Sequence, residues 1–256
     1  MKANTTLFPA FDYSVAPVPV RADIIEAHAR TWDWLRAPGS WWNGAERVEI
    51  AAETRNALDC PLCRERKAAL SPFGIEGDHE HTATTLPEPA IDAIHRIVTD
   101  ATRLSESWVH DLAAQGVTDA HYIELVGIVV SVFSMDELHR GLGIDLLPLP
   151  EPLSGKPRHD RPTGLRSKVA WVPMMTLEGS KNTPNQDLFE GMPIAPNVIA
   201  ALSLVPDGVR RLADLSRSYY VPQHQVPNPT FHGRALDRMQ IELIAGRVSA
   251  LNECFY

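Results

Sequence analysis

The amino-acid sequence predicts an all-α fold. Apolar residues recur at steps of three and four over several stretches, the clearest running from Ile91 through Ile94, Val98 and Leu104 to Leu112. That spacing places them on one face of a helix. No stretch has a confident strand pattern, and glycine or proline follows several of the helical stretches, where helices commonly end.

The first half of the chain is predicted to contain five helices behind an extended, proline-rich arm at residues 1–20. Gly, Pro, Asp and His dominate residues 71–89, which we expect to form a loop. The stretch 122–142 is apolar as far as Phe133, and its length favours a buried helix over a strand. The five expected helices cover 21–36, 45–58, a stretch that begins at the Cys60-Pro61 step, 90–116 and 122–142.

The second half begins with a change in composition. Residues 147–195 are rich in proline and have no helical period, which indicates a linker or wrapping arm. Loops of this length are uncommon inside compact domains, so we place a domain boundary here. Helices are expected again over 197–215, broken near Pro206, and over 236–251. The predicted organisation is therefore an N-terminal domain at 21–146 and a second helical block at 196–256.

Charge and composition exclude several classes of protein. The 256 residues carry a formal net charge of −8 with no block of basic residues, so nucleic-acid binding is not expected. No apolar run approaches the roughly 20 residues of a membrane helix, and the first residues do not resemble a signal peptide. We therefore expect a cytoplasmic protein with no membrane partner. Three cysteines are too few for a disulfide scaffold, and two of them form a CxxC motif.

This motif, Cys60-Pro61-Leu62-Cys63, is the strongest chemical signal. Proline is favoured as the first residue of a helix, which places Cys60 at a helix N-terminus, where the helix dipole favours a thiolate. A thiolate can attack a peroxide, and the second cysteine can resolve the sulfenic acid as a disulfide. The leaving alkoxide needs a proton donor. We consider five residues for that role: Glu49, Glu53, His79, His81 and His139.

Other interpretations of the same residues remain open. Glutamates spaced three and four apart before the motif are also typical of a solvated helix face. A histidine such as His139, after a buried helix, is more often a core residue than a proton relay. Cys60, Cys63, His79 and His81 form a possible zinc set, but the H-x-H spacing is not that of a zinc finger, so we expect no metal and no cofactor. Five histidines have no supporting sequence context: His28, His95, His110, His121 and His159.

Two segments carry a resemblance to a known family. Residues 49–63 (EIAAETRNALDCPLC) resemble the alkylhydroperoxidase D-like, or carboxymuconolactone decarboxylase-like, superfamily, in which a helix bearing a Glu leads into CxxC. Residues 122–142 are similar to the partner helix of that family. Residues 236–256 (LDRMQIELIAGRVSALNECFY) are close to the opening signature, with Glu242 and Cys254 as its Glu and Cys, although Glu49 is one residue closer to Cys60 than Glu242 is to Cys254. The second block is therefore identified as a partial second copy of an alkylhydroperoxidase D-like helical domain.

The resemblance implies a thiol-dependent peroxidase or disulfide reductase. It implies Cys63 as the cysteine that attacks the hydroperoxide, Cys60 as the resolving cysteine, a dithiol electron donor and a homo-oligomer of at least two chains. The histidine that usually follows the second cysteine of the family is absent, since residues 64–67 read Arg-Glu-Arg-Lys. Two alternatives stand beside this one. They are a decarboxylase- or isomerase-like enzyme that transfers protons through Glu and His, and a non-catalytic, zinc-stapled binding protein.

The last residues of the sequence raise a separate question. In the repeated signature, the second cysteine would fall directly after Tyr256. A natural end, a shortened sequence and a selenocysteine codon read as a stop all agree with this. The DNA beyond codon 256 distinguishes them, because the third explanation requires a UGA codon followed by an open frame.

Overall fold

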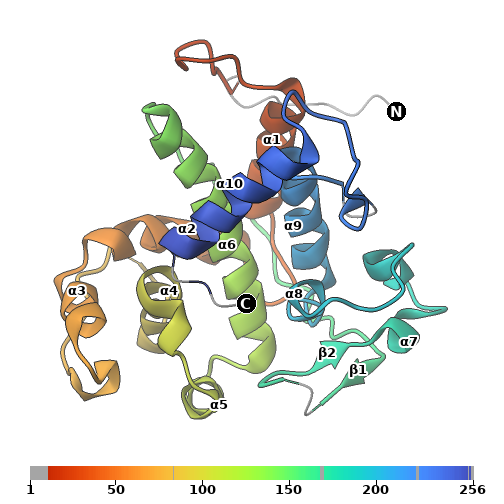
Figure 1. Ribbon diagram of the computed structural model, residues 1–256. Helices are drawn as coiled ribbons and strands as arrows, with labels where there is room; N and C mark the ends of the chain where they lie inside the picture. The colour runs from red at the N-terminus through yellow and green to blue at the C-terminus, as the bar shows by residue number, and fades with distance from the viewer. Residues whose placement is uncertain (1–10, 83, 168–169, 223–224, 253, 255–256) are drawn as a thin grey trace.

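The computed structural model describes residues 11–256 apart from 83, 168–169, 223–224, 253 and 255–256, so half of the expected N-terminal arm and the Tyr256 position lie outside the described residues. The described part is mostly helical, which confirms the all-α prediction (Figure 1). It contains ten α-helices: α1 (Ala22–Arg36), α2 (Gly44–Asn56), α3 (Pro61–Ala68), α4 (Glu88–Asp100), α5 (Glu106–Ala114), α6 (Asp119–Leu142), α7 (Leu177–Ser180), α8 (Asn197–Ala200), α9 (Pro206–Tyr219) and α10 (Arg238–Leu251).

Helix α6 is the central element of the fold. It packs against α1, α2, α4, α5 and α9, and buried residues occur along most of its length. The predicted helix at 122–142 is confirmed and begins three residues earlier, because the Thr118 side chain caps the backbone N–H of His121. Gly143 ends it in the left-handed conformation, with φ of 68°. No single helix among the described residues is long and apolar enough to cross a membrane, and α5 and α6 satisfy that test together only across a 115° bend.

The prediction of a single helix over 90–116 is wrong. The structure divides this stretch into α4 and α5, with a short 3-10 turn between them. Asp100 leaves the helical conformation with φ of −154°, and Ser105 starts α5 by accepting a hydrogen bond from the Trp108 backbone N–H. Asp, Thr and Ser compete for backbone hydrogen bonds and favour helix ends. The apolar periodicity continues across this break, so the sequence pattern alone predicts one continuous helix.

The proline-rich segment 147–195 lies against the helices and contributes to the core. Its backbone bonds to the end of α1 and to the loop that follows, with Leu153 N–H donating to the Arg36 carbonyl and His159 N–H donating to the Ser40 carbonyl. A two-stranded antiparallel sheet follows, formed by β1 (Leu165–Arg166) and β2 (Met174–Met175), where no strand was expected. Five buried side chains of this segment belong to the same hydrophobic core as α1, α2, α4, α6 and α9: Val172, Met174, Met175, Leu188 and Phe189.

The C-terminal helices differ sharply in burial. Helix α9 packs against α1 and α6, and the break expected near Pro206 is present, since Pro206 is its first residue. Helix α10 starts with a capping box between Asp237 and Gln240. Its apolar side chains are largely exposed, with Met239 at 81% and Leu243 at 75%.

A buried ion pair fixes α2 against α6. Arg47 and Glu124 are each 1% exposed and contact one another. The Arg47 guanidinium also donates to the carbonyls of Trp34 and Leu35, and the Trp41 backbone N–H donates to Glu124. The charges are therefore paired and hydrogen-bonded from several sides, as burial requires.

A buried Tyr–His network joins the N-terminal segment to α1, α6 and α9. His139 Nδ1 donates to the Asp145 carbonyl, and its Nε2 lies 2.8 Å from the Tyr13 hydroxyl. The Tyr13 hydroxyl also bonds to His28 Nδ1, and His28 Nε2 bonds to the Tyr219 hydroxyl. Burial above all, with the neighbouring His139, lowers the pKa of His28 to about 3. The His28 imidazole is therefore neutral near pH 7.

Removing one partner of the Arg47–Glu124 pair should destabilise the fold strongly. We expect Glu124→Leu to lower the free energy of unfolding by about 3–5 kcal/mol, because it leaves a buried guanidinium without its counter-charge. Arg47→Met combined with Glu124→Leu should recover most of that loss. Urea unfolding of the three proteins measures this, and a double variant less stable than the single one would contradict the assignment.

The Tyr–His network predicts a defined acid sensitivity. His28 has a folded pKa of about 3 and an unfolded pKa near 6.5, so the unfolded chain binds one more proton between these values. This contribution to stability is complete above about pH 6.5 and falls by roughly 2 kcal/mol by pH 5. The free energy of unfolding, measured by chemical denaturation across pH 5–7, should show that slope in the native sequence. The His28→Gln variant should bind about one proton fewer on unfolding. Identical slopes would contradict the prediction.

Candidate functional site

The CxxC motif lies where the sequence predicts, at the start of a helix. Cys60 is the residue directly before α3, Pro61 opens the helix, and Cys63 lies in its first turn. The free backbone N–H groups of this turn and the helix dipole favour a negative charge on sulfur. Both side chains are buried, with Cys60 1% and Cys63 3% exposed.

Two histidines converge on these sulfurs from different elements. His79 comes from the loop between α3 and α4, and its Nδ1 lies 3.6 Å from both sulfur atoms. His95 comes from α4, and its Nδ1 lies 3.2 Å from the sulfur of Cys63. Their ring centroids are 4.1 Å apart. We call Cys60, Cys63, His79 and His95 the cysteine–histidine cluster.

A carboxylate holds the far nitrogen of each imidazole. His95 Nε2 donates to Glu53 on α2 at 2.7 Å, and His79 Nε2 donates to Asp92 on α4 at 2.9 Å. Glu53 is fully buried and also accepts from the backbone N–H and hydroxyl of Thr82. Each ring is therefore oriented so that Nδ1 faces sulfur and Nε2 faces a carboxylate.

Further cations surround Asp92 and fix its position. Arg66 donates to one carboxylate oxygen at 2.7 Å, and Arg96 donates to the other at 2.8 Å. The Trp108 indole N–H lies 3.3 Å from the same oxygen as Arg96. Burial raises the pKa of Asp92, but the hydrogen bond from His79 and these cations outweigh it, and the pKa lies well below its usual range. Asp92 is therefore an anion that supports His79.

The electrostatics of the cluster favour a thiolate beside an imidazolium. Burial raises the pKa of the Cys63 thiol, but hydrogen bonds from His79 and His95 outweigh it and lower the pKa to about 6. Burial likewise opposes protonation of His95, yet its bonds to Cys63 and Glu53 raise its pKa to about 9. Burial also opposes protonation of His79, but its hydrogen bonds, with Asp92 as the main partner, outweigh burial and raise its pKa. The proton therefore lies on the imidazole and the sulfur of Cys63 is a thiolate near pH 7.

The structure brings together four of the residues singled out from the sequence, Cys60, Cys63, His79 and Glu53. The others lie elsewhere. Glu49 accepts hydrogen bonds from Thr84 and Thr85, His81 is exposed beside Glu88, and His139 belongs to the Tyr–His network. Glu242, on α10, contacts Arg238 of the same helix and Tyr220, which directly follows α9. Cys254 is exposed beyond the end of α10.

His95 and Asp92 were not among the site residues predicted from the sequence. Both residues lie on α4, three residues apart. His95 lies about one helical turn after the buried Ile91. His95 therefore falls within the apolar stripe of a strongly amphipathic helix. A histidine inside such a stripe, close to an aspartate, was the signal that could have identified it. The zinc set suggested by the sequence needs the same correction, because the fourth side chain beside the sulfurs is His95 and not His81.

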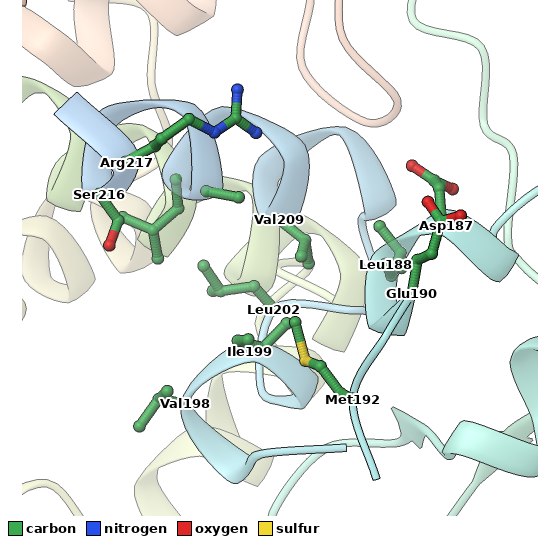
Figure 2. Close-up of a pocket in the computed structure, with 12 residues that line it drawn as sticks. Asp187, Leu188, Glu190, Met192, Val198, Ile199, Leu202, Val209, Ser216 and Arg217 are labelled. Atoms are coloured by element: carbon green, nitrogen blue, oxygen red, sulfur yellow. The ribbon is translucent and has the colours of Figure 1, made fainter. Parts of the chain in front are cut away.

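An apolar cavity lies elsewhere in the molecule. It has a volume of about 370 Å³ and lies between α8, α9 and the turn Gln186–Phe189 (Figure 2). Met192, Ile199 and Leu202 line its floor, with Glu190 and Arg217 on opposite sides. It shares no lining residue with the cysteine–histidine cluster, so we do not assign it to the same site.

Replacing His95 should weaken the acidity of Cys63. In the reduced protein with a metal chelator present, His95→Gln removes one of the groups that stabilise the thiolate, so the pKa of Cys63 should rise from about 6 towards its ordinary value. The ultraviolet absorbance of the thiolate against pH measures this in a Cys254→Ser background, which removes the exposed thiol. Equal titration curves with and without His95 would show that the imidazole does not act on this sulfur.

Comparisons with known proteins add no assignment to this geometry. No family model matches the chain, and neither a characterised protein nor a solved structure is similar to it. The residues and contacts of the site therefore carry the functional argument.

Proposed function

We propose that this chain is a thiol oxidoreductase that reduces small hydroperoxides at the Cys60–Cys63 pair. The observation that carries the proposal is the line Cys63–His95–Glu53, in which a nucleophile, a base and an orienting carboxylate lie in contact at 3.2 Å and 2.7 Å. This is the general arrangement that activates a nucleophile in covalent catalysis. The resemblance of residues 49–63 to the alkylhydroperoxidase D-like superfamily supports the same reaction class.

The proposed reaction begins with the thiolate of Cys63. Its sulfur attacks the terminal oxygen of the hydroperoxide, the O–O bond breaks, and the electron pair leaves with the alkoxide. The imidazolium of His95 or His79 protonates the alkoxide, giving an alcohol, and Cys63 becomes a sulfenic acid. The sulfur of Cys60 then attacks that of Cys63, water leaves, and a disulfide forms. An external dithiol reduces the disulfide and restores both thiols.

Burial of the pair restricts the substrate. Cys60 and Cys63 are almost inaccessible, and Ile75 of the α3–α4 loop packs against the cluster that they form with Leu62. A substrate therefore reaches Cys63 only when this loop, which also supplies His79, moves aside. The buried position favours hydrogen peroxide and short alkyl hydroperoxides over bulky lipid hydroperoxides. A dithiol donor meets the same restriction.

Peroxide consumption by the full chain, with dithiothreitol as the reductant, tests the proposal. Cys63→Ser should abolish turnover, and Cys60→Ser, mixed with peroxide after dithiothreitol is removed, should consume one equivalent and leave a sulfenic acid that dimedone traps. His95→Gln should lower the rate about 10²- to 10⁴-fold, the range for loss of a general acid or base. Cys254→Ser is the matched control and should keep the full rate, because it removes an exposed thiol outside the cluster. Unchanged turnover in Cys63→Ser would overturn the proposal.

A further inference from the structure

The four side chains of the cysteine–histidine cluster have the geometry of a closed metal site. Their ligand atoms, two sulfurs and two imidazole nitrogens, all lie within 4.8 Å of one another, and all four residues are buried. They come from three elements, the start of α3, the α3–α4 loop and α4. We propose that the reduced chain binds one Zn²⁺ through Cys60, Cys63, His79 and His95.

The distances between donor atoms support a tetrahedral ion. Zn–S bonds near 2.3 Å and Zn–N bonds near 2.0–2.1 Å, at the tetrahedral angle, place sulfur and nitrogen about 3.6 Å apart. The Cys60–His79 and Cys63–His79 separations are both 3.6 Å, and the Cys63–His95 separation is 3.2 Å. These three separations are therefore close to those that a tetrahedral ion requires.

The outer contacts of the histidines support the same ion. A metal-bound imidazole commonly donates its second N–H to a carboxylate, which fixes the ring and its tautomer. Both histidines meet this condition, His95 with Glu53 and His79 with Asp92. Mixed thiolate and imidazole ligands in a tetrahedron favour zinc over magnesium or calcium, which prefer oxygen. Four protein ligands leave no open position, so the ion would be structural and not catalytic.

Bound zinc would also control the redox chemistry of the pair. With both sulfurs coordinated, neither is free to attack a peroxide, so turnover would belong to the zinc-free chain. Oxidation of the pair, once the ion has left, balances as two thiols and one hydroperoxide giving a disulfide, an alcohol and water. This consequence rests on the proposed oxidoreductase function, whereas the zinc site itself does not.

Zinc analysis of the purified full chain tests the inference. We expect about one zinc ion per reduced chain after reconstitution, and loss of most of it in His79→Gln, His95→Gln and Cys63→Ser. His81→Gln and Cys254→Ser are matched controls and should keep the ion, because both side chains are exposed and lie outside the cluster. Cobalt substitution of the native chain gives a readout that needs no variant. It should give the strong visible absorption of tetrahedral Co²⁺ and thiolate-to-cobalt charge transfer.

The possible failures are distinguishable. A native chain that takes up no zinc, with no thiolate-to-cobalt band, would overturn the zinc site, while peroxide turnover of that chain would leave the oxidoreductase proposal intact. Conversely, one tightly held zinc per chain, together with a chelator-stripped chain that consumes no peroxide, would support the zinc site and reject the oxidoreductase. Equal zinc content in the cluster variants and the two controls would also overturn the site.

Discussion

The hydrogen bond between Glu53 and His95 is the interaction on which the site depends. Glu53 is a fully buried carboxylate, and it accepts from His95, Thr82 and Asn56 at once. A buried anion is costly unless it is satisfied in this way. Its position fixes the far nitrogen of His95, and this leaves Nδ1 directed at the sulfur of Cys63. Without that constraint the imidazole could rotate away, and neither a thiolate nor a metal ligand set would be maintained.

The same arrangement suits both proposed chemistries because each needs the same deprotonated sulfur. A positive charge beside Cys63 favours the thiolate, whether that charge is an imidazolium or a metal ion. The difference lies in access. A metal ion enters once and then closes the site, whereas a substrate must enter and leave in every turnover. Because Cys60 and Cys63 are buried, with Ile75 packed against the cluster that they form with Leu62, the proposed turnover would require motion of the α3–α4 loop.

The sequence predicted the parts of the structure that local physics controls. The length and apolar character of residues 122–142 predicted the buried helix, and Pro61 predicted the helix start beside Cys60. Contacts between distant residues were not predictable. His95 is 32 residues from Cys63, and Asp100 breaks a helix whose apolar period continues beyond it. Nor did composition indicate that the proline-rich segment supplies core residues, because its packing depends on surfaces formed by other helices.

Nitrogen NMR of the His95 ring in the full reduced chain tests the central claim most directly. If Glu53 fixes this ring against Cys63, the Nε2 proton should exchange slowly with water and the ring should not titrate between pH 6 and 7.5, with metal present or absent. Glu53→Gln should restore both fast exchange and titration. A His95 ring that titrates near 6.5 in the native chain, as an unperturbed histidine does, would contradict the account.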